Sequence, residues 1–321
     1  MAIELCDYTL RTGTGLKTSE VRSIAVGLAR AGIENIELGR LTDASDIAAY
    51  TEMLRGMAQD ASFSMMMDAE HFDCIDYTRL PECNGILQKI RLPLHREAKA
   101  KTLETARMLA GKGYKSIYNI EGIYTYSDME LLQLCEEIRG TDADQVTIAD
   151  STTLIDCRPL QRIALLLDNN LAPQVKIGLC SEGNAQLSHF IADSFLAVSM
   201  QQKRTVVVEG TLFGRGNPYG CICTECMADL LNEGFGASYD YGELIRLIST
   251  FMPESNADPG NSGAYHPAFY LSAKNHVDGE YSRYFLSKGI LLSELDAVLK
   301  KVAETQSFCL FDESVAEQVQ V

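Results

Sequence analysis

Short apolar runs alternate with amphipathic stretches through roughly the first 235 residues of the chain. The runs are short, as strands in a sheet are, and the stretches between them place apolar residues three and four positions apart, as helices do. Strands that alternate with helices are typical of a parallel sheet. The apolar runs cover residues 3–6, 35–38, 62–67, 87–92, 116–120, 146–149, 175–179 and 206–208. The helical stretches begin near residue 18 and then cover residues 45–58, 97–111, 127–138, 158–169, 185–200 and 224–233.

Eight such units predict a closed (β/α)8 TIM barrel in the α/β class rather than an open, doubly wound sheet. The first run is not followed by the G-x-G-x-x-G pattern with which many open sheets bind dinucleotides. Beyond residue 236 the alternation stops, and residues 252–266 are rich in Pro, Gly, Ser and Asn. We expect a barrel domain over residues 1–235 and a helical extension over residues 236–321 that packs on the barrel. The helical patterns of the extension cover residues 267–276, 281–288 and 293–305.

Composition and charge narrow the classes of partner. The chain of 321 residues is 46% hydrophobic, which is ample for a core, and no apolar run approaches the ~18 residues of a membrane span. The formal net charge of −16 repels phosphate backbones and anionic lipids, so we expect no nucleic acid and no membrane as partners. The first residues, MAIELCDYTLRTG, lack the basic and then apolar segments of a secretory signal. We therefore expect a cytoplasmic protein whose ten cysteines are reduced.

Polar residues lie near the end of every predicted strand. In a (β/α)8 barrel the active-site groups come from these positions, at the carboxyl ends of the strands. The set is rich in carboxylates and predicts a polar pocket at that end, which we call the barrel mouth. Its members are Asp7, Arg11, Glu37, Asp68, His95, Asn119, Asp150, Cys180, Glu182, Thr211 and Arg215.

Four stretches of the chain look like known motifs. CDYTLRTGTG is similar to D-x-T-L-R-D-G, AGIENIELG to A-G-[IV]-x-x-I-E-[VL]-G, IADSTTLIDCRPL to a D-[ST]-x-G segment, and VEGTLFGRGN to a strand with a glycine loop. Together they resemble the metal-dependent pyruvate aldolases and acyl-transferring synthases, a superfamily with a shared barrel. It includes 4-hydroxy-2-oxovalerate aldolase, the homocitrate and isopropylmalate synthases and 3-hydroxy-3-methylglutaryl-CoA lyase. The segment YHPAFYLSAKNHVDGEYSRYFLSKG resembles the aldolases most.

This resemblance implies a carbon–carbon lyase or aldolase that acts on pyruvate or another small, carboxylated 2-oxo acid. Such a reaction passes through an enolate, whose negative oxygen a divalent cation and an arginine stabilise. The arginine of the family corresponds to Arg11, and a pocket carboxylate corresponds to Glu37. His95 and Asp150 are further candidates for proton transfer and substrate orientation. From the residues alone, Arg11 could instead pair with Asp7, and Glu37 could form a salt bridge at the barrel rim.

The chain departs from the family at each expected metal ligand. Thr12 replaces the acidic residue after the arginine, and Cys180 and Glu182 replace the two histidines of a His-x-His pair. A further ligand of the synthases aligns with Cys221. Three interpretations stay open. Cys180, Glu182 and Cys221 could hold a divalent metal ion such as zinc or manganese; the site could work without a metal, through Arg11; or the chain could be a catalytically silent binding or scaffold protein.

Other polar residues of the mouth are candidates for holding the substrate. We expect Arg215 and the amides of its glycine loop to bind a substrate carboxylate. His266 could reach the mouth as part of a lid. The remaining candidates are Asp7, Asn119 and Thr211.

The segment CICTEC holds three closely spaced cysteines, Cys221, Cys223 and Cys226. A structural zinc or iron–sulfur site usually needs four ligands, and no second close pair follows. Packing in a loop is therefore the preferred interpretation, with metal binding and a reactive thiol as alternatives. His189 falls within a predicted helix and is expected to be an ordinary packed or exposed residue.

Two further expectations concern function and partners. A synthase that condenses an acyl-CoA with a 2-oxo acid, as homocitrate synthase does, is the alternative enzyme. The resemblance also implies a homodimer and, as for some aldolases, a partner dehydrogenase that consumes an aldehyde. The sequence shows no surface that identifies either partner.

Overall fold

Eight parallel strands close into a barrel, which confirms the predicted (β/α)8 fold. Each strand pairs with the next along the chain, and β1 pairs with β8 to close the barrel. The strands are β1 (Ile3–Asp7), β2 (Asn35–Arg40), β3 (Ser62–Met66), β4 (Leu87–Leu94), β5 (Lys115–Glu121), β6 (Ala143–Asp150), β7 (Lys176–Ser181) and β8 (Val206–Gly210). The structure, a computed structural model, describes residues 2–12, 16–56, 61–68, 75–76, 78–83, 85–150, 157–182, 188–200, 204–216, 221–252, 267–305 and 310–319.

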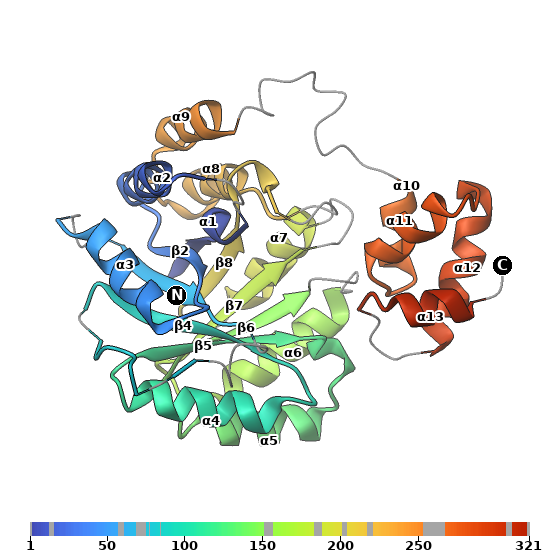
Figure 1. Cartoon of the computed structure of the whole chain (residues 1–321), viewed down its shortest axis with the longest axis horizontal. Coiled ribbons are helices and arrows are strands. Elements are labelled where there is room, and N and C mark those ends of the chain that lie inside the picture. Colours follow the sequence, from blue (N-terminus) through green and yellow to red (C-terminus); the bar gives the residue numbers. More distant parts are fainter. Residues whose placement is uncertain are drawn as a thin grey trace.

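Helices surround the barrel on the outside (Figure 1). The described residues between β3 and β4 form turns instead of a helix, in agreement with the weak helical pattern there. The helices of the barrel are α1 (Thr9–Thr12), α2 (Thr18–Arg30), α3 (Ala44–Leu54), α4 (Lys99–Ala110), α5 (Asp128–Ile138), α6 (Cys157–Asn170), α7 (Ser188–Ser199) and α8 (Thr224–Phe235). Two short 3-10 helices, η2 (Ile123–Thr125) and η3 (Leu212–Gly214), follow β5 and β8.

At the starts of α3 and α5, side chains satisfy backbone amides that have no partner within the helix. Asp43 accepts a hydrogen bond from the amide of Ser45 at the start of α3. Ser127 and Glu130 cap each other's amides at the start of α5. The strand-to-helix connections are thereby fixed locally.

The interior of the barrel carries ion pairs where branched apolar side chains are usual. Near the amino ends of the strands, the Nζ atom of Lys176 lies 2.6 Å from the carboxylate of Glu4. The same carboxylate accepts a hydrogen bond from Asn35 at 2.8 Å. Lys89 pairs with Asp144 at 2.8 Å. Each charge in this layer therefore has a partner across the barrel, as a buried charge requires.

Arg91 lies one layer further toward the mouth and is fully buried. Its Nε donates to Glu37 on β2 at 2.5 Å, and its Nη2 lies 3.0 Å from Glu209 on β8. Glu209 also accepts from Gln145 at 2.6 Å and from Thr147 at 2.8 Å. Arg91 therefore connects strands on opposite sides of the barrel through fully buried, charge-assisted hydrogen bonds.

Gly178 on β7 leaves the space that this network occupies. A Cβ atom at this position would lie 2.8 Å from Thr147 Oγ1 and 2.9 Å from Glu209 Oε1. Any larger residue would displace the acceptor of Arg91. The glycine is needed here because of a close approach of side chains and not because of its backbone angles.

The described residues of the C-terminal region form five more helices. The first, α9 (Tyr241–Phe251), packs against α2 and adds Leu244 and Leu247 to the hydrophobic cluster of the barrel. The other four form a second hydrophobic cluster around Tyr281 and Phe285, in a lobe beside the barrel (Figure 1). They are α10 (Pro267–Lys274), α11 (Gly279–Ser287), α12 (Leu292–Thr305) and α13 (Glu313–Gln318).

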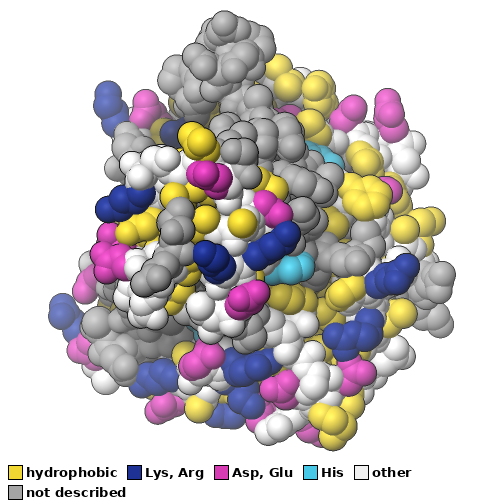
Figure 2. Space-filling model, turned by 90° about the vertical axis from the view of Figure 1, so that its right-hand side faces the viewer, with side chains coloured by type: hydrophobic (Ala, Val, Ile, Leu, Met, Phe, Trp, Pro, Cys, Tyr) yellow, Lys and Arg dark blue, Asp and Glu magenta, His cyan; other side chains and the backbone are white. Residues whose placement is uncertain are grey.

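The surface of the described residues carries both signs of charge. On the face shown in Figure 2, Lys and Arg side chains are interspersed with Asp and Glu, and the coloured residues form no extended basic patch. Within the described parts of the chain, every helix is too short or too polar to cross a membrane.

Replacing Glu37 tests how far the fold depends on the buried ion pairs. Glu37→Gln leaves Arg91 and Arg11 without their shared negative partner, and we expect the free energy of unfolding to fall by about 3–5 kcal/mol. The matched control is Glu136→Gln, which loses an exposed pair with Arg139 and should cost less than about 1 kcal/mol. Urea denaturation measures both. Equal losses in the two variants would contradict the role given to Glu37.

Candidate active site

Arg11 lies at the centre of the barrel mouth, in the short helix that follows β1. The turn into this helix is fixed because Asp7 accepts the amide of Thr9 at 2.9 Å. The guanidinium donates from Nη1 to Glu37 at 2.9 Å and from Nη2 to Glu182 at 2.8 Å. It also lies over the ring of Tyr8, 4.3 Å from the ring centroid. With 8% of its side chain exposed, Arg11 is held in one orientation at the edge of solvent.

Glu37 acts as an anchor for two guanidinium groups. Burial alone would raise its pKa, but Arg11 and Arg91 outweigh that effect and hold the pKa below its ordinary value. The carboxylate is therefore ionised at neutral pH and is a poor proton donor. These contacts are salt bridges, as in the alternative interpretation of Glu37. Its second partner, Arg91, was missed by sequence reasoning.

Cys180 and Glu182 lie two residues apart at the end of β7, and one hydrogen bond joins their side chains. Cys180 Sγ lies 3.5 Å from Glu182 Oε1, the same oxygen that Arg11 binds. Burial, then the charges of Glu182 and Glu209, raise the pKa of the Cys180 thiol well above its ordinary value. The thiol therefore keeps its proton at neutral pH, whereas a metal ligand must be a thiolate. A metal ion bound here would have to displace both this proton and the guanidinium of Arg11.

Cys221, the third predicted metal ligand, lies beside this pair. Its backbone forms an isolated antiparallel bridge with Glu182, and its side chain is buried. Glu182 and Cys221 are thus neighbours along the backbone, but the ligand atoms of Cys180, Glu182 and Cys221 do not all lie within 4.8 Å of one another. Metal binding by these three residues stays a prediction.

Two buried hydroxyl groups at the mouth are unpaired within the described part of the chain. They are the hydroxyls of Tyr8 and Thr211. Burial, then the nearby groups Cys180 and Cys221, raise the pKa of Tyr8 well above its ordinary value, so its hydroxyl is a proton-bearing donor. A buried donor without a partner costs free energy, and a bound ligand with oxygen atoms would remove that cost.

The other predicted site residues lie in different surroundings. Asn119 is buried, accepts from Arg91 at 3.2 Å and donates to Glu121 at 2.7 Å, so it belongs to the network inside the barrel. Asp7 is fully buried and accepts from Thr224 at 2.6 Å, which connects β1 to α8. His95, after β4, and Arg215, after η3, are half-buried. The side chain of Asp150 and all of His266 lie outside the described residues.

Sequence reasoning missed Arg91, Glu209 and Tyr8. For Arg91 and Glu209 the available signal was a charged residue inside an apolar run, as in KIRLPL and VVVEG. In a half-buried strand such a residue is read as facing solvent. Closure of the barrel encloses the inner face of each strand and turns these charges into partners.

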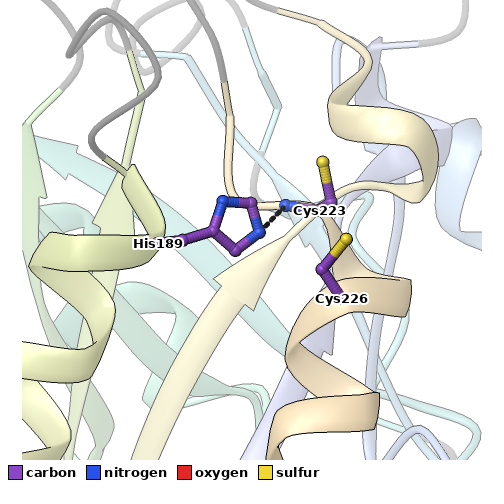
Figure 3. Close-up of side chains that lie close together, drawn as sticks. All are labelled: His189, Cys223 and Cys226. Atoms are coloured by element: carbon purple, nitrogen blue, oxygen red, sulfur yellow. Dashed lines mark hydrogen bonds between the residues drawn. The ribbon is translucent and has the colours of Figure 1, made fainter.

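A cluster of sulfur and imidazole ligands lies beyond the ends of β7 and β8. His189 Nε2 accepts a hydrogen bond from the amide of Cys223 at 3.2 Å, and Cys226 lies next to both (Figure 3). Hydrogen bonds with Cys223 and then His189 lower the pKa of the Cys226 thiol to about 5. The interpretation of His189 as an ordinary helix residue is therefore incomplete, because the fold brings it to the cysteines.

Comparisons with known proteins bear on the fold. No family model matches the sequence, and no curated protein matches it. The chain is similar to the solved N-terminal domain of a protein from Bacteroides vulgatus assigned as an aldolase, with 16% identity over 88% of this chain and 96% of that chain and a TM-score of 0.74. It is also similar to hydroxymethylglutaryl-CoA lyase from Pseudomonas aeruginosa, with 12% identity over 90% of this chain and 98% of that chain and a TM-score of 0.60.

A third similar structure is the carboxyl transferase domain of Rhizobium etli pyruvate carboxylase, solved with pyruvate. The identity is 13%, the match covers 95% of this chain and 56% of that chain, and the TM-score is 0.68. At such identities the likeness establishes a shared barrel fold and nothing finer. Any activity for this chain has to be argued from its own residues.

The buried carboxylate of Asp7 predicts a pH-dependent stability. Burial raises its pKa from 3.8 to about 6, so the folded protein takes up a proton at higher pH than the unfolded chain does. Ionised Asp7 therefore lowers stability above pH 6, and this loss is recovered as the pH falls through 6 toward 3.8. We expect Asp7→Asn to be more stable relative to the parent at pH 8 than at pH 4, by about 2–3 kcal/mol.

Urea denaturation of both proteins at pH 4, 6 and 8 measures this difference. Asn still offers an oxygen to the amide of Thr9, so the turn is kept. The control is Asp128→Asn, which loses an exposed pair with Arg162 and should change stability by less than about 1 kcal/mol at each pH. An effect of Asp7→Asn that is constant with pH would show that Asp7 does not titrate as described.

Proposed function

We propose that this protein is a carbon–carbon lyase of the aldolase type that forms an enolate from a small, carboxylated 2-oxo acid and stabilises it with Arg11 in place of a metal ion. The observation that carries the proposal is the fixed position of the Arg11 guanidinium between Glu37 and Glu182. Glu182 stands where the family motifs have a metal-ligating histidine, and here it binds Arg11. An always-charged guanidinium is then the group that supplies positive charge to an enolate.

Arg11 has donor capacity for a substrate. A guanidinium carries five N–H groups. In the described contacts Nη1 donates to Glu37 and Met66, and Nη2 donates to Glu182. Among the described residues, no acceptor is bonded to Nε or to the second N–H of Nη2, and these groups could bind an enolate oxygen or a carboxylate. Because the fork is already oriented and largely buried, little reorganisation accompanies the development of negative charge on the substrate.

The proton-transfer group in this proposal is the pair of Cys180 and Glu182. Cys180 keeps its proton at neutral pH because its pKa is raised, and its sulfur lies 3.5 Å from the Glu182 carboxylate. A protonated thiol beside the enolate could deliver a proton to carbon, and Glu182 could accept one. The hydroxyls of Tyr8 and Thr211 supply further donors for substrate oxygens.

The barrel fold is compatible with this class of substrate. The chain shares its fold with a hydroxymethylglutaryl-CoA lyase and with a carboxyl transferase domain solved with pyruvate. Enolate chemistry on 2-oxo acids is compatible with a barrel mouth of this kind.

Exchange of the methyl protons of pyruvate with deuterium from solvent tests the proposal. We expect NMR to detect exchange with the parent protein, unchanged after treatment with EDTA. Arg11→Lys keeps the charge but loses the fork, so the exchange rate should fall by about 10²–10³-fold. Circular dichroism confirms that the variant is folded.

The matched control is Arg40→Lys, whose arginine pairs with Asp68 and is 49% exposed. Its exchange rate should equal that of the parent. Exchange that EDTA abolishes and manganese restores would show that the enolate is bound to a metal. An absence of exchange with pyruvate and with 2-oxobutyrate would overturn the lyase proposal in favour of a binding protein.

A further inference from the structure

His189, Cys223 and Cys226 bring three metal-binding atoms together from two helices. His189 is the second residue of α7, Cys223 is the N-cap of α8, and Cys226 is in the first turn of α8. One ligand atom from each residue lies within 4.8 Å of the other two. Within the described residues, this is the one set of three histidine, cysteine or acidic side chains with such convergence.

The backbone around the cysteines is fixed by the barrel. The amide of Thr224 donates to the carbonyl of Thr211 at 2.9 Å, and the amide of Thr211 donates to the carbonyl of Ile222 at 2.9 Å. The Thr224 hydroxyl donates to buried Asp7 at 2.6 Å. Cys223 and Cys226 are therefore held at the ends of β1 and β8 by contacts that need no metal.

Gly214 leaves room for the sulfur of Cys223. Gly214 has φ of +58°, and a Cβ atom there would lie 3.0 Å from Cys223 Sγ. On the other side, His189 accepts the Cys223 amide and is half-buried. Such preorganisation lowers the cost of binding an ion.

The chemistry of these atoms identifies the class of ion. Two cysteine sulfurs and one imidazole are a zinc-type donor set, whereas magnesium and calcium prefer oxygen ligands. In a tetrahedral site with Zn–S of about 2.3 Å and Zn–N of about 2.0–2.1 Å, ligand atoms lie about 3.5–3.8 Å apart. Atoms already within 4.8 Å reach that spacing by small side-chain rotations. His189 would exchange its bond from the Cys223 amide for the bond to the ion.

We propose that this chain binds one zinc ion through His189, Cys223 and Cys226, with the fourth position open to solvent. The open position follows from Cys226, which is exposed. The ion would connect the starts of α7 and α8 at the outer edge of the mouth. This site shares no residue with Arg11 and its partners, so it stands independently of the proposed lyase activity.

Metal analysis of protein purified in reductant and without chelator tests the proposal. We expect about one zinc per chain by mass spectrometry. After the zinc is removed, cobalt(II) should restore stoichiometric binding and give a thiolate-to-cobalt charge-transfer band. Zinc should also raise the unfolding temperature, because an ion that binds only the folded state stabilises it.

Cys226→Ser and His189→Gln should each lose the zinc, the charge-transfer band and the thermal shift. The control is Cys83→Ser: Cys83 Sγ donates to the carbonyl of Leu87, and a serine hydroxyl can keep that bond. This variant should retain all three properties. Circular dichroism of the metal-free proteins shows whether each variant is folded.

Two results would overturn the proposal. One is that the reduced parent protein binds neither zinc nor cobalt at one ion per chain. If thiol titration also finds a Cys223–Cys226 disulfide before reduction, the two cysteines form a redox pair instead. The other is zinc that survives both Cys226→Ser and His189→Gln, which would place the ion elsewhere.

Discussion

The shared carboxylate of Glu37 is the interaction on which the barrel interior and its mouth both depend. One of its oxygens accepts from Arg91 and the other from Arg11. A fully buried arginine is stable only when its charge is matched at hydrogen-bonding distance. Glu37 neutralises two arginines, and one of them is the buried Arg91. The position of Arg11 at the mouth is therefore set by the buried ion pair of Glu37 and Arg91.

The same requirement for matched charges applies to a row of side chains that alternate in charge. Glu209, Arg91, Glu37, Arg11 and Glu182 follow one another from the barrel centre to the mouth. The inner end is fully buried, whereas the Glu182 side chain is 16% exposed. In the proposed function, an anionic substrate therefore exchanges with Glu182, the better solvated partner, while Glu37 keeps Arg11 in place.

Much of the barrel could be predicted from sequence, because the periodicity of a buried strand or an amphipathic helix is local. All eight apolar runs are strands, and Arg11, Glu37, Cys180 and Glu182 lie together because strand ends converge in a closed barrel. Helix α9 was missed, since it lies past the point where the alternation of strands and helices stops.

The partnerships inside and around the site could not be predicted. Glu37 and Arg91 are 54 residues apart, and Arg91 and Glu209 are 118 apart. His189 and Cys223 are 34 residues apart and meet only because α7 and α8 follow neighbouring strands. No local sequence pattern encodes contacts between residues so far apart along the chain. A charged residue that faces the barrel interior could therefore not be distinguished from one that faces solvent.

Binding of oxalate tests the central claim most directly, because oxalate is a planar dianion similar in shape and charge to the enolate of pyruvate. Titration calorimetry would compare the untreated protein, the chelator-treated protein and Arg11→Lys. We predict that chelator-treated protein binds oxalate as tightly as untreated protein and that Arg11→Lys binds it more weakly. Binding that requires added zinc or manganese, with Arg11→Lys equal to the parent, would contradict a guanidinium-centred site.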